Sequence, residues 1–277
     1  MDNTAIIVVG EIRNKSPNQK KLFSKNLEIF NRENVFFSTY EEDAQELKGW
    51  KANILTIKRS ELLNTDSPGL NWIFPKDFKH TLAEGRVIQH VHLRNCVERF
   101  CDKISKYDYV LKTRVDVNSN IQQCIQSIQK NPNKFSMASD LSYGCGINLF
   151  MKMFYENNFL NFVKKLINND KSYVSLNHKN LLGSINSNPN CFKWWWIRYP
   201  NSIKTVSKDS VLSLCKKNIN NNADIQTYEI KKDWAEKTID NKNFSNHFSS
   251  EKYLALYALL FSEINQLQSP AIPPIIR

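Results

Sequence analysis

A strand-like stretch in the first half of the chain ends in three charged side chains. Residues 107–117 read Tyr-Asp-Tyr-Val-Leu-Lys-Thr-Arg-Val-Asp-Val, and the β-branched and aromatic residues among them predict a buried strand. Because side chains alternate between the two faces of a strand, Lys112, Arg114 and Asp116 share one face at its carboxyl end. Ligands of open α/β sheets bind at that end. Two cations and a carboxylate there suit a phosphorylated ligand with a divalent metal; the plainer interpretation is a surface salt-bridge cluster.

The segments around this charged strand alternate between strand-like and helix-like patterns. Residues 5–9 form a continuous apolar run closed by Gly10, which is typical of a central parallel strand. Residues 19–31 predict a helix, and residues 35–40 and 53–57 predict two further strands. Residues 85–105 carry apolar side chains at helical spacing just before the charged strand. The alternation predicts an α/β fold, with a Rossmann-type, mainly parallel sheet flanked by helices.

The second half of the chain has weaker patterns. The apolar spacing there favours helices, so we expect an α/β half over residues 1–150 and a mostly helical half of the same domain over residues 151–277. The expected helices are 118–129, 148–168 and 249–264; the expected strands are 134–138 and Trp194–Trp196; the expected loops are 177–190, 216–222 and the Pro-rich tail.

The charge balance favours acidic partners. Lys and Arg number 38 against 27 Asp and Glu, a net charge of +11, and such a surface attracts nucleotides, nucleic acid or an anionic membrane leaflet. The cations occur in short pairs rather than long runs, which disfavours nucleic acid. The apolar stretches are too short for a bilayer span or a signal peptide, so we expect a cytoplasmic protein that is peripheral to a membrane at most.

The cysteines and histidines give no metal motif. The six cysteines form no C-x-x-C pair, so we expect reduced thiols that mostly fill the core, with Cys145, between two glycines, as the exception at the surface. His90 and His92 are two residues apart and do not share a helix face. Neither histidine is assigned a role.

Five short motifs follow one another in an order that resembles a known family. They are Val9-Gly10-Glu11-Ile12, Ser38-Thr39-Tyr40 with the later Arg86 and Gln89, Lys112-x-Arg114-x-Asp116, Ser139-Asp140-Leu-Ser-Tyr143-Gly144, and Ser250-Glu251-Lys-Tyr253. This order is similar to that of the WavE-type glycosyltransferases of bacterial lipopolysaccharide and capsule synthesis. The resemblance covers most of residues 5–155 and the Glu251 motif. It implies a GT-A-like fold, with a nucleotide-sugar-binding first half and an acceptor-side second half.

The chain departs from the family pattern at three places. Tyr40 stands where the family has Trp, and two residues separate Arg86 from Gln89, which are adjacent in the family. Arg114 replaces the first carboxylate of the D-x-D motif. Asp116 with the donor phosphates would then hold Mg²⁺ or Mn²⁺ weakly, or Arg114 would neutralise the diphosphate in place of the metal.

The resemblance also implies roles for individual residues. The donor-binding residues would be Gly10, Glu11, Arg13, Ser38, Thr39, Arg86, Gln89, Lys112 and Arg114. Asp140 or Glu251 would be the catalytic base. Each role has a plainer alternative: a βα turn at Gly10, a strand-end turn at Ser38 and Thr39, a turn residue at Asp140 just before an aromatic-Gly turn at Tyr143 and Gly144, and a helix-start carboxylate at Glu251.

The resemblance therefore implies a glycosyltransferase that moves a sugar from a nucleotide-sugar to a lipopolysaccharide or capsule acceptor. Its partners would be the donor, a glycan or lipid-linked glycan, and the inner membrane, without nucleic acid. A nucleotidyltransferase is the alternative among enzymes, although the segment after residues 5–9 lacks a Gly- and Lys-rich phosphate loop. A basic nucleic-acid-binding protein is the alternative from another class.

Overall fold

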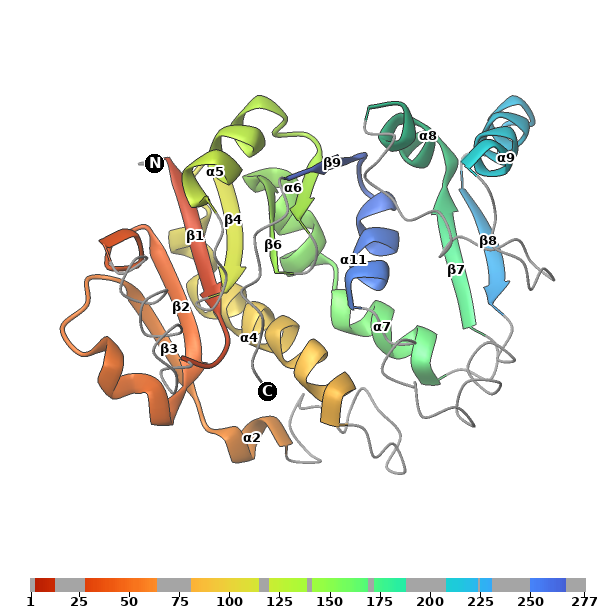
Figure 1. Cartoon of the computed structure of the whole chain (residues 1–277). Helices are drawn as coiled ribbons and strands as arrows, with labels where there is room; N and C mark the ends of the chain where they lie inside the picture. Colours follow the sequence, from red (N-terminus) through yellow and green to blue (C-terminus); the bar gives the residue numbers. More distant parts are fainter. Residues whose placement is uncertain are drawn as a thin grey trace.

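The computed structural model describes residues 3–12, 28–63, 81–114, 120–138, 141–168, 172–187, 208–223, 225–230 and 250–267. Its main feature is a seven-stranded sheet with the strand order β3-β2-β1-β4-β6-β5-β9 (Figure 1). The strands are β1 (Thr4–Val9), β2 (Val35–Tyr40), β3 (Asn53–Ile57), β4 (Tyr109–Arg114), β5 (Phe135–Ala138), β6 (Ser142–Gly146) and β9 (Ile264–Gln266). Among these, β6 runs against its neighbours and the others are parallel. The predicted α/β class with a mainly parallel sheet is confirmed.

The central strands are apolar because both faces of the sheet are covered. β1 is buried along its whole length. Alternate residues of β1 and β2 face the long helix α4 (Thr81–Ile104), where Val87, Val91 and Val97 pack. The remaining residues face α5 (Ile121–Lys130) and the 3-10 helix η1 (Glu41–Leu47). The continuous apolar run of β1 is the pattern that burial on both faces demands.

A second group of helices extends the α4 side of the sheet. These are α6 (Ile147–Met151), the π-helix η2 (Lys152–Glu156), α7 (Phe159–Asn168) and α11 (Ser250–Leu259). Their aromatic side chains pack together: the Tyr257 ring contacts Phe154, Phe159 and Phe162, and the Tyr257 hydroxyl donates to the Met153 carbonyl. In Figure 1, α11 and α7 lie side by side next to a two-stranded antiparallel sheet of β7 (Ser172–Asn177) and β8 (Ile225–Ile230).

The structure corrects several details of the second half. Residues 177–190 were expected to be a loop, but His178–Ser187 form helix α8, and Lys208–Asn220 form α9 where a turn was expected at 216–222. The helix expected over 249–264 ends at Leu259, and Ile264–Gln266 is strand β9. The two missed helices have one cause: Asn and Ser favour loops in isolation, whereas packing against neighbouring elements decides here.

Two further expectations were wrong. Cys145 is fully buried in β6, not at the surface, and burial raises the pKa of its thiol. Tyr143 and Gly144 are strand residues of β6 that pair with β4 rather than forming a turn. A Cβ on Gly144 would lie 2.0 Å from the Val110 carbonyl oxygen, so glycine is required for β6 to pack this closely against β4. The expected Trp194–Trp196 strand, most of the helix expected over residues 19–31 and the Pro-rich tail fall outside the described residues.

Candidate functional site at the carboxyl edge of the sheet

The chain order creates a topological switch point between β1 and β4. From β1 the chain proceeds to β2 and β3 on one side, and it then returns to the other side of β1 for β4 (Figure 1). Connections from the two strands therefore leave in opposite directions at their carboxyl ends, which opens a crevice for ligands in α/β sheets. Val9 and Arg114 are paired in the register of β1 and β4 and form the two sides of that point.

Gly10 ends β1 with a backbone that side-chain-bearing residues rarely adopt. Its φ is +106°, and its N–H donates to the Ser38 carbonyl of β2 at 3.0 Å. A Cβ at this position would meet nothing within 4 Å. Among the described residues, the glycine is therefore needed for its backbone angle and not for close packing.

Arg59 brings together the carboxyl ends of the first three strands. It begins the short helix α2 (Arg59–Leu63) just after β3, and its guanidinium lies 3.9 Å from the centre of the Tyr40 ring at the end of β2. The same group pairs with Glu11 at 3.3 Å and with Glu42 at 3.2 Å. About 45% of the Arg59 side chain remains exposed, so an incoming anion can reach the cation from solvent.

Asp43 fixes the loop that leaves β1. Its carboxylate oxygen Oδ2 accepts from the Ile12 backbone N–H at 2.9 Å and from the Thr39 hydroxyl at 2.8 Å. Thr39 is fully buried. Its hydroxyl thus holds the Asp43 carboxylate in this structure, and the carboxylate positions the backbone that follows Gly10 and Glu11.

Ser38 has a partner inside the protein as well. Its hydroxyl lies 2.9 Å from His92 Nδ1 of α4, and both side chains are fully buried. The His92 ring meets Tyr40 edge-on, with 4.9 Å between the ring centres. Burial, with a smaller contribution from the nearby Arg59, lowers the pKa of His92 to about 4. His92 is therefore neutral near pH 7. Its ring packs against Tyr40, whose own ring contacts the Arg59 guanidinium.

Lys112 lies in the core under α4. Its Nζ donates to the Gln89 amide oxygen at 2.5 Å and lies 4.8 Å from the centre of the Tyr143 ring. Lys112 is fully buried, whereas Arg114, two residues further on the same face, is partly exposed at the strand end. The structure thus brings Lys112 and Gln89 together, but both are buried in the interior and not at the carboxyl edge of the sheet. From there the ammonium adds positive potential to the Arg114 end of β4.

The remaining candidate residues are described only in part. Arg13, Asp116 and Asp140 fall outside the described residues, as do the side chains of Arg86 in α4 and Glu251 in α11. Across the described ranges, no three His, Cys, Asp or Glu side chains are grouped closely enough to hold a metal ion. In the same ranges, no helix is long and apolar enough to cross a membrane.

Sequence reasoning missed Arg59, Asp43 and the part played by Tyr40. A signal was present: each residue falls within three positions of the end of a predicted strand, and parallel strands bring such positions to one edge. Comparisons with family models and with curated proteins give no match for this chain.

Proposed function

We propose that this protein is a glycosyltransferase with a GT-A-like fold, which transfers a sugar from a nucleotide-sugar donor to a surface glycan such as lipopolysaccharide or capsule. The observation that carries the proposal is the switch point between β1 and β4, where Gly10, the Arg59 cluster and Arg114 lie at the carboxyl edge of the sheet. A mostly parallel sheet with one reversed strand inside it, β6, is in keeping with a GT-A-like fold.

The charges at this edge suit a nucleoside phosphate. Arg114 at the end of β4 and Arg59 after β3 provide guanidinium groups, which bind phosphate oxygens with two parallel hydrogen bonds. Buried Lys112 adds charge without direct contact. Glu11 and the Asp43-held loop beyond Gly10 offer acceptors for ribose or base hydroxyls and N–H groups.

The reaction needs two further kinds of residue. The bond between the sugar anomeric carbon and the phosphate oxygen breaks, the acceptor oxygen bonds to that carbon, and the acceptor proton passes to a base. Asp140 or Glu251 would take that proton. Mg²⁺ or Mn²⁺ on Asp116 would neutralise the leaving phosphate. Arg114 would share that task, so a weakly held metal would be sufficient.

The cell location follows from the substrates. Nucleotide-sugars are cytoplasmic and the lipid-linked acceptors of surface glycans lie at the inner membrane, so a basic cytoplasmic protein in loose contact with that membrane fits both. The net charge of +11 supports such a contact.

A thermal-shift panel tests the donor class. The protein is heated with uridine, guanosine and cytidine sugars, each with and without Mn²⁺, and binding to the folded state raises the melting temperature. One nucleotide family should stabilise the protein, and manganese should add to that effect if Asp116 holds a metal. No stabilisation by any donor would overturn the proposal. Salt-dependent retention on heparin without a donor shift would favour a nucleic-acid-binding protein instead.

Transfer itself is measured with the donor that stabilises the protein. Its radiolabelled sugar should pass to a lipid-linked or polysaccharide acceptor fraction, and nucleoside phosphate should be released in equal amount. Release of pyrophosphate from a nucleoside triphosphate and a sugar phosphate would identify a nucleotidyltransferase.

A further inference from the structure

Two consecutive residues of the 3-10 helix η1 bond to the segments that follow β1 and β3. Asp43 bonds to the loop after β1, where its Oδ2 accepts from the Ile12 N–H at 2.9 Å. Glu42 bonds to the start of α2 after β3, where its Oε1 accepts from Arg59 Nε at 3.2 Å. Since η1 follows β2 directly, this short helix connects the carboxyl ends of three neighbouring strands.

A buried hydroxyl of β2 fixes the Asp43 carboxylate. Thr39 Oγ1 donates to the same Oδ2 at 2.8 Å, and the Thr39 side chain has no exposed surface. Thr39 is β-branched and pairs with Thr56 in the register of β2 and β3, so its side chain has little rotamer freedom. One carboxylate oxygen therefore joins a rigid strand residue to the backbone of a loop.

The loop that Asp43 holds contains a partner of Arg59. Gly10, with φ of +106°, donates its N–H to a carbonyl of β2 at 3.0 Å, and Ile12 donates its N–H to Asp43. Glu11 lies between these two anchored N–H groups, so its backbone is held on both sides. Its carboxylate accepts from Arg59 Nη2 at 3.3 Å.

The hydrogen bonds thus run from a buried hydroxyl to an exposed cation. About 45% of the Arg59 side chain is exposed, so a ligand at the edge can contact its guanidinium. Thr39 offers a ligand no surface, and its hydroxyl donates to Asp43. Any effect of Thr39 on a ligand at this edge must therefore pass through Asp43 and the loop.

We propose that Thr39 and Asp43 are positioning residues for the donor site. They fix the turn at Gly10 and Glu11 through the Ile12 N–H, and Glu11 holds the Arg59 guanidinium where the donor phosphates arrive. Neither Thr39 nor Asp43 touches the donor. The inference rests on the function proposed above and explains how a buried strand residue sets the affinity of that site.

The physical reason is the ordering of a flexible side chain. A free arginine has many rotamers, and a phosphate that binds it must select one of them. A guanidinium already held by Glu11 and Glu42 needs less ordering. Removing the Thr39 hydroxyl frees the Asp43 carboxylate to turn away from the loop, so that Glu11 no longer has a fixed backbone. Donor affinity should then fall, although the group that contacts the phosphate is unchanged.

The first test compares Thr39→Val, which keeps the shape and removes the hydroxyl, with Thr39→Ser, which keeps the hydroxyl. The matched control is Ser184→Ala in α8, because buried Ser184 accepts from the Ile264 N–H at 2.8 Å near the opposite edge of the sheet. Calorimetric titration with UDP, GDP and CDP measures affinity. Thr39→Val should weaken the binding of the preferred diphosphate by roughly 2- to 30-fold. Thr39→Ser should recover most of that loss, and Ser184→Ala should show none.

Asp43→Ala should match Thr39→Val, and the double variant should bind no more weakly than Asp43→Ala, because both residues act through one oxygen. Asp43→Asn should keep most of the affinity, since an amide oxygen also has two lone pairs for these donors. Additive losses in the double variant would show that Thr39 contacts the donor, and Asp43→Asn as weak as Asp43→Ala would show that the charge acts directly. Either result would overturn the proposal.

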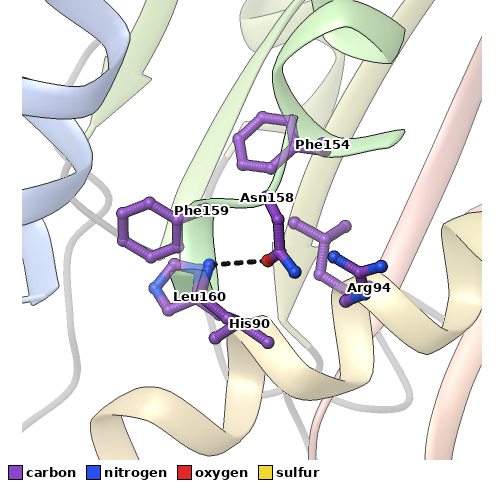
Figure 2. A pocket seen from close by; sticks show the side chains of 7 residues that line it. His90, Arg94, Phe154, Asn158, Phe159 and Leu160 are labelled. Carbon is purple, nitrogen blue, oxygen red and sulfur yellow. Dashed lines mark hydrogen bonds between the residues drawn. The ribbon is translucent and has the colours of Figure 1, made fainter. Parts of the chain in front are cut away.

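The matched control for Asp43→Ala is Asn158→Ala. The Asn158 side-chain oxygen also accepts two hydrogen bonds, from the N–H groups of Leu160 at 2.9 Å and Asn161 at 3.3 Å. Figure 2 shows the bond to Leu160, which lies at the start of α7 and not at the carboxyl edge of the sheet. Asn158→Ala should therefore lower the melting temperature and leave diphosphate affinity intact. An equal loss of affinity in both variants would mean that destabilisation alone explains the effect and would overturn the proposal.

A second measurement needs no nucleotide. In the unliganded protein, NMR reports hydrogen exchange at the Ile12 N–H and the environment of the Arg59 Nε–H. In Thr39→Val, Ile12 should exchange faster and the Arg59 signal should move toward that of exposed Arg99, whereas Ser184→Ala should change neither. Asp43→Ala gives the same comparison if Thr39→Val fails to fold. Unchanged signals would overturn the positioning role; a wild-type protein that binds none of the three diphosphates would instead overturn the function proposed for the edge.

Discussion

The Arg59 guanidinium lies 3.9 Å from the centre of the Tyr40 ring, and it pairs at the same time with Glu11 and Glu42. These contacts connect the segments that follow β1, β2 and β3. Each exposed pair contributes little stability, because solvent screens the attraction between the two charges. Their effect is to hold one guanidinium at the switch point before a ligand arrives, which reduces the ordering cost of binding there.

Arg114→Ala should sharply weaken donor binding. A charge-assisted hydrogen bond to a phosphate contributes roughly 1.5–3 kcal/mol, or about 10- to 150-fold in affinity. Calorimetric titration of the donor that stabilises the protein measures the change. The matched control is Arg99→Ala, which removes an exposed arginine from α4 and should leave affinity intact. Unchanged affinity in a folded Arg114→Ala protein would refute the proposed role.

Gly10→Ala should cost stability and donor affinity, whereas Gly49→Ala should cost stability alone. Both glycines have positive φ, +106° and +82°, and neither would bring a Cβ into contact with other atoms. The backbone penalty should therefore be about 1–2 kcal/mol for each. Only Gly10 lies at the switch point. Urea unfolding and donor titration of the two variants separate the effects; equal donor affinity in both would exclude a role of the Gly10 turn in binding.

The sheet was predictable because burial on two faces leaves a strong pattern. The expected strands 35–40 and 53–57 agree with β2 and β3 residue for residue, since each is a short run of β-formers ended by polar residues. The positions of Gly10 and Arg114 at strand ends were predictable to the same extent, and the structure pairs Arg114 with Val9 in the register of β1 and β4.

The contacts within the site were not predictable from the sequence. Ser38 and Thr39 look like ligand-binding hydroxyls until their partners His92 and Asp43 are known, and those partners come from other elements. Lys112 reads as a surface cation by alternation alone, yet α4 covers it and supplies Gln89. Tertiary packing decides which polar groups come into contact, and the order of residues along the chain does not predict these contacts.

The free energy of unfolding should fall as pH falls, and part of this fall should come from the protonation of His92. Burial lowers its pKa to about 4 in the folded protein, against about 6.5 when unfolded. Between these two pH values the unfolded chain binds a proton that the folded protein does not. The contribution of neutral His92 to the free energy of unfolding is therefore complete above pH 6.5 and is lost as pH falls toward 4. The slope from this group approaches about 1.4 kcal/mol per pH unit.

The comparison of His92→Gln with Ser38→Ala tests the assignment. His92→Gln removes the titrating group and should flatten the dependence of unfolding free energy on pH between 6.5 and 4. Ser38→Ala removes the hydrogen bond but keeps the imidazole, so its slope should stay close to that of wild type. His90 adds a slope in the same direction in every sample, because its pKa is lowered too. Identical slopes in wild type and His92→Gln would contradict the role of His92.

The protein should bind anionic vesicles and release them as salt increases. A net charge of +11 is attracted to acidic lipid, and this attraction is screened over about 10 Å at 0.1 M salt. Sedimentation with vesicles that contain phosphatidylglycerol, and with neutral vesicles as the control, measures it. Equal binding to both kinds of vesicle, or binding to neither, would argue against contact through charge.

Glu251→Gln should abolish sugar transfer and leave donor binding intact. The substitution keeps the shape and hydrogen-bonding capacity of the side chain but removes the proton acceptor. Glu251 lies in the first turn of α11, where a carboxylate also stabilises the helix dipole. If stabilisation is its only role, the change should cost a few tenths to about 1 kcal/mol of stability with transfer nearly normal. Transfer rate and melting temperature, measured together, separate the two roles.

Asp140→Asn is the reciprocal experiment and the control for the same choice between bases. Asp140 precedes β6, the strand that pairs with β4 beside the proposed donor site, whereas Glu251 belongs to a helix that packs firmly through Tyr257. A base acts best when its position is fixed, and α11 is held in place by the packing of Tyr257. We therefore expect the larger loss of transfer from Glu251→Gln. Near-normal turnover of Glu251→Gln, with an inactive but folded Asp140→Asn, would assign the base to Asp140.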